Sequence, residues 1–156
     1  MRDYLPDPAA TDALARRLQA ELPADTAGWT LLLEGELGAG KSAFARALIM
    51  AMGHRGKVPS PTYTLVEPYH LALGIVYHVD LYRVSSEEEL RYLGWGELDD
   101  GFRLVEWPDR APGLTASADL LVNLEYADTS GRNAVITGLS PRGEDLVARM
   151  DRAATS

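Results

Sequence analysis

The chain has 156 residues, a net charge of −8 and no cysteine, and 46% of its residues are hydrophobic. This length predicts one domain with a substantial core. The lack of cysteine excludes disulfides and thiolate metal sites, and the acidic balance argues against broad nucleic-acid binding. Because no apolar run is long enough to span a membrane and the N-terminus lacks a signal-peptide layout, we expect a cytoplasmic protein without membrane association.

The first elements in chain order are a helix, a strand and a second helix. Asp7 and Pro8 are typical of a helix start, with an N-cap followed by proline. Leucines at helical spacing then continue to Pro23: Leu14, Leu18 and Leu22. Residues 29–34 form an apolar run of strand length, and residues 41–52 have helical periodicity before a glycine.

The middle of the chain predicts an extended segment, a hairpin and a short helix. Prolines restrict residues 59–62 to extended backbone. Tyr63 to Tyr69 and Gly74 to Val79 are strand-like runs around a short break, which indicates a hairpin. A capping-box pattern at Ser86 predicts a short helix that ends near Gly94.

The last part of the chain predicts three strands and a helix. Residues 102–106 form another buried strand candidate. Residues 119–126 and 133–138 flank a turn-rich segment and indicate a second hairpin. A final helix is expected from about Pro141 to Met150, followed by a frayed tail at 151–156.

Residues 35–42 contain the complete G-x-x-x-x-G-K-[ST] phosphate-loop pattern, in the order Gly35, Glu36, Leu37, Gly38, Ala39, Gly40, Lys41 and Ser42. The glycines let backbone N–H groups turn toward phosphate oxygens. Lys41 supplies a positive charge for the β- and γ-phosphates, and Ser42 supplies a hydroxyl for Mg²⁺. A strand before the loop and a helix after it complete an anion site.

Strands that interleave with helices, together with two hairpins, predict the fold class. We expect an α/β, phosphate-loop NTPase-like three-layer fold with a mixed parallel and antiparallel sheet. Residues 1–156 would form this single domain.

Two carboxylates end hydrophobic strands, where a phosphate loop with Mg²⁺ needs acidic partners. Asp80 ends the run 75–80 and Glu106 ends the run 102–106. The alternative for each is a carboxylate in a solvated turn. Since Mg²⁺ prefers six oxygen ligands and keeps several waters, two direct carboxylates would crowd it. We therefore assign Glu106 to the metal with Ser42, and Asp80 to a metal-bound or attacking water.

Two further residues are catalytic candidates beside Lys41 and Asp80. His78 alternates with Asp80 along its strand, so that both side chains share a face and His78 could orient the water at Asp80. The alternative is a hydrogen-bonded histidine within the sheet. Thr62 lies in the proline-restricted loop and is a candidate for a switch threonine near the γ-phosphate; a simple turn residue is the competing interpretation.

The blocks Gly35–Ser42, Ser60–Val66, His78–Arg83 and Leu104–Pro108 occur in the order and spacing of the bacterial TsaE (YjeE) family. The chain resembles this family from about Tyr4 to the strand that starts at Asn133. The phosphate loop is shared by many families, whereas the Ser-Pro-Thr and His-x-Asp-x-Tyr-Arg blocks together are specific.

The resemblance implies the ATPase component of tRNA threonylcarbamoyladenosine biosynthesis, which binds ATP or ADP with Mg²⁺ and hydrolyses ATP slowly. It implies TsaD and TsaB homologues as partners in a turnover step, and leaves a direct contact with tRNA open. It also implies that Lys41 grips phosphate, that Ser42 and Glu106 belong to the Mg²⁺ site and that Asp80 is the essential acid. The family's adenine position corresponds to the surroundings of Asp7 and Ser130 to Arg132, so Asp7 and Arg132 are nucleotide-binding candidates.

Three alternatives to this ATPase share the phosphate loop. A small-molecule kinase needs an acceptor site and usually an arginine-bearing lid, and the arginines here are scattered: Arg83, Arg91 and Arg103. A GTPase would use an Asn-Lys-x-Asp block, which this sequence lacks. The third alternative is a nucleotide-sensing module without catalysis; the intact Lys41, Ser42, Asp80 and Glu106 argue for hydrolysis but do not prove it.

Overall fold

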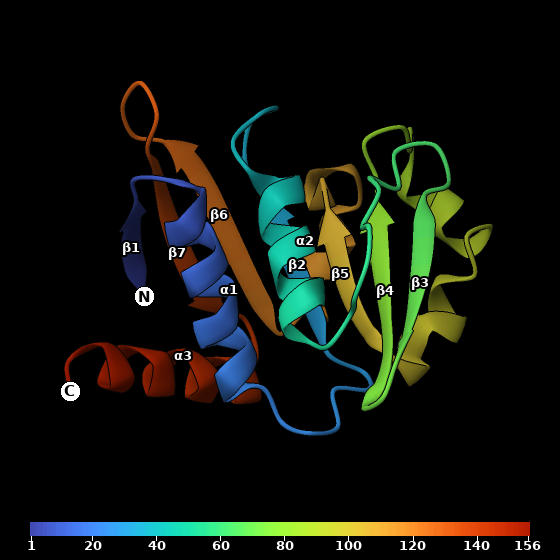
Figure 1. The fold of residues 1–156 in the computed structure, drawn as a ribbon. Helices are drawn as coiled ribbons and strands as arrows, with labels where there is room; N and C mark the ends of the chain where they lie inside the picture. Colours follow the sequence, from blue (N-terminus) through green and yellow to red (C-terminus); the bar gives the residue numbers. More distant parts are fainter.

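The computed structural model describes residues 1–156, which form a seven-stranded sheet in the order β1-β7-β6-β2-β5-β4-β3 (Figure 1). The strands are β1 (Arg2–Leu5), β2 (Thr30–Glu34), β3 (Val66–Leu71), β4 (Gly74–Asp80), β5 (Phe102–Glu106), β6 (Leu120–Tyr126) and β7 (Arg132–Gly138). The α-helices are α1 (Pro8–Glu21), α2 (Lys41–Ala51) and α3 (Pro141–Ala154). Four 3₁₀ helices complete the chain: η1 (Glu87–Arg91), η2 (Trp95–Asp100), η3 (Pro108–Arg110) and η4 (Pro112–Ala116).

The central strands β6, β2, β5 and β4 are parallel, and both edges of the sheet are antiparallel. β3 pairs with β4 in one hairpin, and β7 pairs with β6 in another and with β1 at the outer edge. This confirms the predicted mixed sheet and both hairpins. None of the three α-helices has the length and apolar character that a membrane crossing requires.

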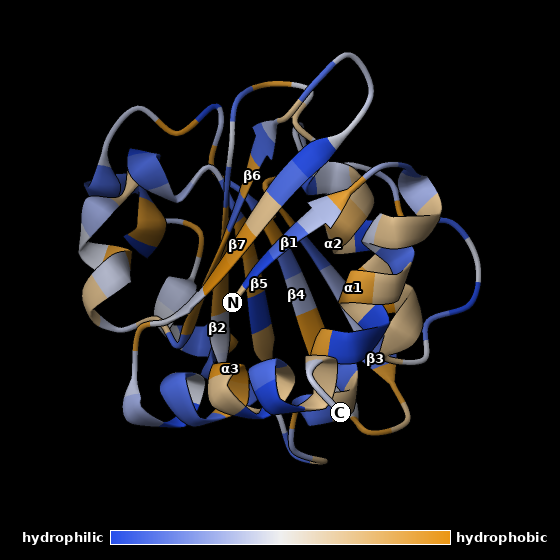
Figure 2. Cartoon of the chain, turned by 90° about the vertical axis from the view of Figure 1, so that its left-hand side faces the viewer, coloured by the Kyte–Doolittle hydropathy of each residue, from blue (hydrophilic) through white to orange (hydrophobic).

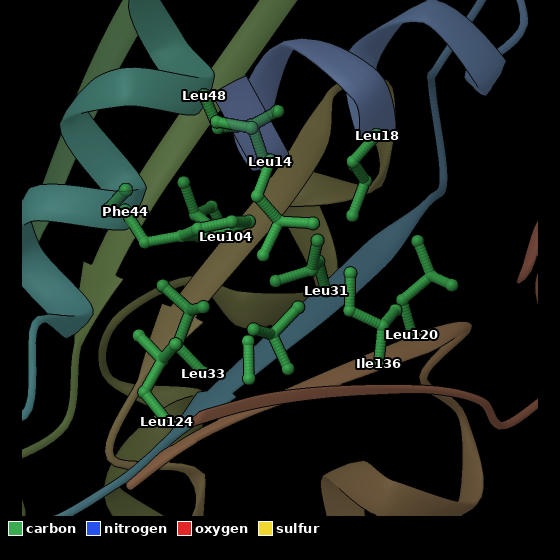
Figure 3. Packing of buried hydrophobic residues seen from close by; sticks show 14 of the residues in the cluster. Leu14, Leu18, Leu31, Leu33, Phe44, Leu48, Leu104, Leu120, Leu124 and Ile136 are labelled. Carbon is green, nitrogen blue, oxygen red and sulfur yellow. The ribbon is translucent and has the colours of Figure 1, made fainter. Parts of the chain in front are cut away.

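The larger part of the core lies between the sheet and the three α-helices. Because side chains alternate along a strand, Leu31 and Leu33 face the helices while Leu32 faces the opposite layer. Figure 3 shows leucines of α1 and Phe44 of α2 directed at these strand residues. Burial of large apolar side chains is the main favourable contribution to folding. The packing of Phe44 against Leu31 and Leu33 therefore holds α2 on the sheet.

The second face of the sheet is covered by the segment from residue 81 to residue 118, which contains the four 3₁₀ helices. Its apolar side chains form a smaller core with the other face of β2, β4 and β5: Leu32, Val79, Leu81, Val84, Leu90, Leu98, Val105, Ala111, Leu114 and Ala118. Figure 2 shows the sheet between this segment and the α1–α2 layer, with α3 crossing below. The predicted three-layer arrangement is confirmed, with 3₁₀ turns in place of α-helices in one layer.

Both predicted helix starts with a proline are confirmed. The Asp7 carboxylate accepts a hydrogen bond from the Ala10 N–H and caps α1, and the Ser140 hydroxyl caps α3 in the same way through Gly143. α3 continues to Ala154, four residues beyond its predicted end, and therefore includes part of the expected tail.

Two local predictions were wrong, and one strand was missed. Residues 61–64 form a turn closed by the Leu65 N–H on the Pro61 carbonyl, so they are not extended and β3 starts only at Val66. The predicted capping residue makes no capping bond, and Ser85 instead donates to Glu89. β1 was missed because its four residues carry no alternation of their own and are held as a strand by β7.

The end of the sheet opposite the phosphate loop is tied together by Asp119, a buried residue directly before β6. Its carboxylate accepts hydrogen bonds from the Thr30 N–H (3.0 Å), the Ser140 hydroxyl (2.7 Å) and the Arg142 guanidinium (2.8 and 3.0 Å). Burial by itself raises the pKa of this carboxyl, but the bonds from Arg142, Ser140 and Thr30 outweigh it and hold the pKa below the ordinary 3.8.

Asp119→Asn should lower the free energy of unfolding at neutral pH by about 2 kcal/mol, because hydrogen bonds to a charged group are lost. The loss is no larger because Arg142 is half exposed, and solvent weakens its ion pair with Asp119. Since the folded-state pKa is lowered, the contribution of Asp119 is present above its unfolded pKa and is lost as the pH falls through the folded pKa. Urea unfolding of both proteins from pH 7 downward should show the difference shrinking below about pH 4. A difference that does not change with pH would contradict this assignment.

Candidate active site

The phosphate loop connects β2 to α2 at the carboxyl edge of the parallel strands. Gly35 and Gly38 have φ angles of 151° and 81°. A Cβ atom at Gly35 would lie 2.5 Å from the Leu124 carbonyl oxygen, and one at Gly38 would lie 2.6 Å from the Tyr126 hydroxyl. These two glycines are therefore required both by the backbone conformation and by the close approach of β6.

Lys41, the first residue of α2, is buried and directed back over the loop. Its Nζ donates to the carbonyls of Gly35 (2.5 Å) and Glu36 (3.0 Å) and lies 4.0 Å from the ring centroid of Trp107. Burial lowers the pKa of Lys41, and the carboxylates of Glu106, Asp80 and Asp109 oppose this effect. The ammonium group thus stands at the centre of an acidic site.

Trp107 adopts the left-handed conformation with a φ of 59°, which is uncommon for a residue with a bulky side chain. This turn directly after β5 brings the indole over Lys41 and against the Tyr82 ring, 5.0 Å between centroids. The role of Tyr82 was missed in the sequence analysis. Its position two residues after Asp80 was the available signal.

Asp80 and Glu106 are register partners at the ends of the parallel strands β4 and β5, and both are buried. Equivalent positions on adjacent strands carry their side chains on the same face, here the face that α2 covers. The Glu106 carboxylate accepts from the Ser42 hydroxyl (3.0 Å) with one oxygen, while its other oxygen lies 2.6 Å from His78 Nε2.

The position of His78 agrees with the alternative interpretation, a hydrogen-bonded histidine within the sheet. Its ring is buried and its Nε2 is hydrogen-bonded to Glu106, not to Asp80. His78 Nδ1 has no hydrogen-bond partner. The predicted alternation of side chains along β4 is correct, but the imidazole of His78 is hydrogen-bonded to Glu106 on the neighbouring strand β5.

Asp80 is instead linked to the loop that precedes β3. The Thr62 hydroxyl donates to Asp80 Oδ2 at 3.0 Å, and the Tyr82 N–H donates to Oδ1 at 2.9 Å. The Ser60 and Thr62 hydroxyls lie 2.8 Å apart. The Asp80 N–H also donates to the carbonyl of Leu65 (2.9 Å), a residue with a φ of 69°. The predicted switch loop is therefore in contact with the strand-end acid.

These groups surround one pocket of about 300 Å³ at the mouth of the phosphate loop. Its lining comprises Leu37, Gly38, Gly40, Lys41, Ser42, Ala43, Ser60, Thr62, Asp80, Tyr82, Glu106 and Trp107. The donor set fits Mg²⁺, because the Ser42 hydroxyl and the Glu106 carboxylate are adjacent oxygen ligands and the cation otherwise takes waters and phosphate oxygens.

Five predicted nucleotide-binding residues lie outside this lining: Gly35, Glu36 and Ala39 of the loop, and Asp7 and Arg132. The Asp7 carboxylate accepts the capping hydrogen bond of α1 from the Ala10 N–H. Arg132 lies at the start of β7 and donates to carbonyls of the loop itself, those of Gly38 and Ala39. Tyr126, which donates to the Leu37 carbonyl, was not predicted. No signal in the sequence identified it, because the pairing of its strand with β2 is decided by the tertiary structure.

A glycine loop between a parallel strand and a helix, with strand-end carboxylates beside it, defines a phosphate-loop NTPase-like protein. The model of the family described as "Threonylcarbamoyl adenosine biosynthesis protein TsaE" matches residues 5–134, and the chain belongs to this family.

Relatives of known name agree with this family. The chain is 40% identical over 118 residues to the tRNA threonylcarbamoyladenosine biosynthesis protein TsaE of Haemophilus influenzae, covering 74% of each protein. It is 37% identical over 119 residues to the TsaE of Synechocystis sp., covering 73% of this chain and 74% of that protein. The crystal structure of Bacillus subtilis YdiB is similar with a TM-score of 0.76 and 25% identity, and the match covers 99% of this chain and 95% of that one.

His78→Leu should lower the free energy of unfolding by about 1–3 kcal/mol, because it leaves one oxygen of the buried Glu106 carboxylate without its partner. His78→Gln keeps a donor group and should cost less. Urea unfolding of the two variants and the wild type measures both differences. Equal losses for Leu and Gln would mean that the ring contributes by packing and not by its bond to Glu106.

Proposed function

We propose that the chain binds ATP with Mg²⁺ and hydrolyses it slowly, in support of the threonylcarbamoyl modification of adenosine in tRNA. The observation that carries this proposal is the convergence of Lys41, Ser42, Glu106 and Asp80 on one pocket at the carboxyl edge of the sheet. In open α/β sheets ligands bind at this edge, and these residue types are those that phosphoryl transfer requires.

Each of these residues has a distinct task in the proposed reaction. Lys41 exchanges its bonds to the loop carbonyls for the β- and γ-phosphates, whose charge it offsets in a partly buried site. Ser42 and Glu106 hold the metal ion, which when bound neutralises charge on the phosphates. Asp80 accepts a hydrogen bond from the attacking water and orients it in line with the γ-phosphate.

Thr62 links the nucleotide to the surface of the protein. In the present structure its hydroxyl bonds to Asp80. A γ-phosphate offers a competing acceptor, so that Thr62 and its loop would change partner between the ATP and ADP states. We propose that this loop reports the nucleotide state to TsaD and TsaB homologues in the cytoplasm. A direct contact with tRNA is not part of the proposal.

A small-molecule kinase is the alternative, but no observation favours it. The pocket lining contains no arginine. Arg103 donates to the Thr30 hydroxyl, and Arg83 lies 5.3 Å from the ring of Tyr63, the residue after Thr62. None of the scattered arginines lines the pocket.

The decisive experiment is ATP hydrolysis by the purified chain, alone and with a TsaB–TsaD pair, beside Lys41→Ala. We expect slow Mg²⁺-dependent release of phosphate that the pair stimulates, and its loss in the variant, whose ATP affinity should also fall strongly by calorimetry. Unchanged ATP affinity in Lys41→Ala would count against the phosphate-loop assignment. ADP formation that depends on a small metabolite would indicate a kinase.

Glu106→Gln and Asp80→Asn should separate metal binding from hydrolysis. Glu106→Gln removes a charged metal ligand and should reduce the Mg²⁺-dependent part of the nucleotide affinity. Asp80→Asn should mainly lower the single-turnover hydrolysis rate, by about 10²-fold or more for a group that orients the attacking water, while nucleotide still binds. If Asp80→Asn loses the Mg²⁺-dependent affinity and Glu106→Gln retains it, the two roles are reversed.

The segment 57–66 should exchange its amide hydrogens differently in the two nucleotide states. A non-hydrolysable ATP analogue should protect it more than ADP, because a γ-phosphate would order the Thr62 loop. Hydrogen-exchange mass spectrometry with each ligand at saturation measures this. Residues 87–91, in a 3₁₀ helix on the other face of the sheet, provide the internal control. Identical protection of 57–66 in both states would contradict the switch.

A further inference from the structure

Three successive carbonyls of the phosphate loop accept hydrogen bonds from one side, all from the β6–β7 hairpin. The Tyr126 hydroxyl donates to the Leu37 carbonyl at 3.0 Å. Arg132 donates to the Gly38 carbonyl through Nη2 at 3.3 Å and to the Ala39 carbonyl through Nε at 3.2 Å. Two side chains from outside the loop thus hold the outer edge of the segment that faces the phosphate pocket.

The two donors form a preorganised pair. Tyr126 and Arg132 are opposite each other in the register of β6 and β7, and the guanidinium lies 4.3 Å from the centroid of the tyrosine ring. Arg132 Nη1 also donates to the carbonyls of Ser130 (3.1 Å) and Gly131 (3.0 Å). Four backbone carbonyls therefore fix the plane of the guanidinium, which leaves it little freedom to turn toward a ligand.

The orientation of these carbonyls determines where the loop's N–H groups point. In a planar trans peptide the C=O and the following N–H point in opposite directions. With the carbonyls of residues 37 and 39 held outward, the N–H groups of Gly38 and Gly40 are directed inward, and neither has a backbone or side-chain acceptor within the chain. Inward N–H groups without partners are the anion-binding element of a phosphate loop.

Gly38 is adapted to this contact. A Cβ atom at this position would lie 2.6 Å from the Tyr126 hydroxyl oxygen, so any other residue would displace the tyrosine from the loop. The glycine that the motif requires for its own conformation is thus also the residue that lets the hairpin approach.

We propose that Tyr126 and Arg132 are positioning residues that hold the phosphate loop open for the phosphates of the nucleotide. The pair acts through the loop carbonyls and does not itself contact the ligand. This inference rests on the proposed function, since it assigns to β6–β7 the preorganisation of the same nucleotide site. Preorganised donors bind an anion more tightly because no ordering cost arises on binding.

The test uses the full chain with Tyr126→Phe and Arg132→Lys, each in the wild-type background. Tyr126→Phe removes one hydroxyl, and Arg132→Lys keeps the positive charge but replaces the planar fork, whose Nε and Nη2 bond separate carbonyls, with a single ammonium nitrogen. Tyr77→Phe is the matched control, because its hydroxyl also makes one exposed hydrogen bond, 2.7 Å to Asp100 and away from the loop. The readouts are ADP and ATP affinity by calorimetry, and ¹⁵N relaxation of the loop amides without nucleotide.

We expect the dissociation constants of ADP and ATP to rise together, by about fivefold in Tyr126→Phe and up to about 25-fold in Arg132→Lys, as the loss of one and of two hydrogen bonds at about 1 kcal/mol each suggests. The order parameters of the Gly38 and Gly40 amides should fall in both variants without ligand. The affinities for ADP and ATP and the loop order should be unchanged in Tyr77→Phe.

The remaining outcomes overturn the inference in distinguishable ways. Unchanged affinities in both variants would show that the pair does not position the loop. A loss of affinity confined to Arg132→Lys, with loop order unchanged, would make Arg132 a direct ligand of the nucleotide. If the wild-type chain binds neither ADP nor ATP, the proposed function fails, while the relaxation data still decide whether the hairpin orders the loop.

Discussion

The parallel pairing of β2, β5 and β4 is the constraint on which the site depends. It aligns the carboxyl ends of three strands at one edge of the sheet, with Asp80 and Glu106 opposite each other and the phosphate loop directly after β2. A shift of register by one residue would turn a strand-end carboxylate to the opposite face. Because Leu31, Leu33 and Leu104 bury that same face against the helices, the apolar core and the acidic site specify the same register.

Two buried carboxylates next to each other would be unfavourable without compensation. Each has partners of its own: Ser42 and His78 for Glu106, and Thr62 with the Tyr82 N–H for Asp80. Lys41 supplies the positive charge between them. The site is therefore a connected polar network in which every carboxylate oxygen has a donor, and in which the groups that would bind ligand also stabilise the fold.

Lys41 links this network to the loop. Its ammonium donates to two loop carbonyls and lies against the Trp107 ring. The β6–β7 hairpin holds the opposite side of the loop through Tyr126 and Arg132. The loop is thereby fixed from both sides, by its own helix and by a strand pair that is distant in sequence.

Local sequence determined the phosphate loop, the strand–loop–helix order, the two hairpins, the N-caps at Asp7 and Ser140 and the strand-end positions of Asp80 and Glu106. These features depend on neighbouring residues, where periodicity, capping and turn chemistry act directly.

The tertiary structure decided which side chains meet. His78 alternates with Asp80 in sequence yet bonds to Glu106, because β5 lies beside β4 in the sheet. β1 is a strand only because β7 offers it an edge, and Tyr126 and Arg132 reach the loop only because β6 pairs with β2. Such contacts join residues far apart in the chain, so they become visible only once strand order and register are fixed.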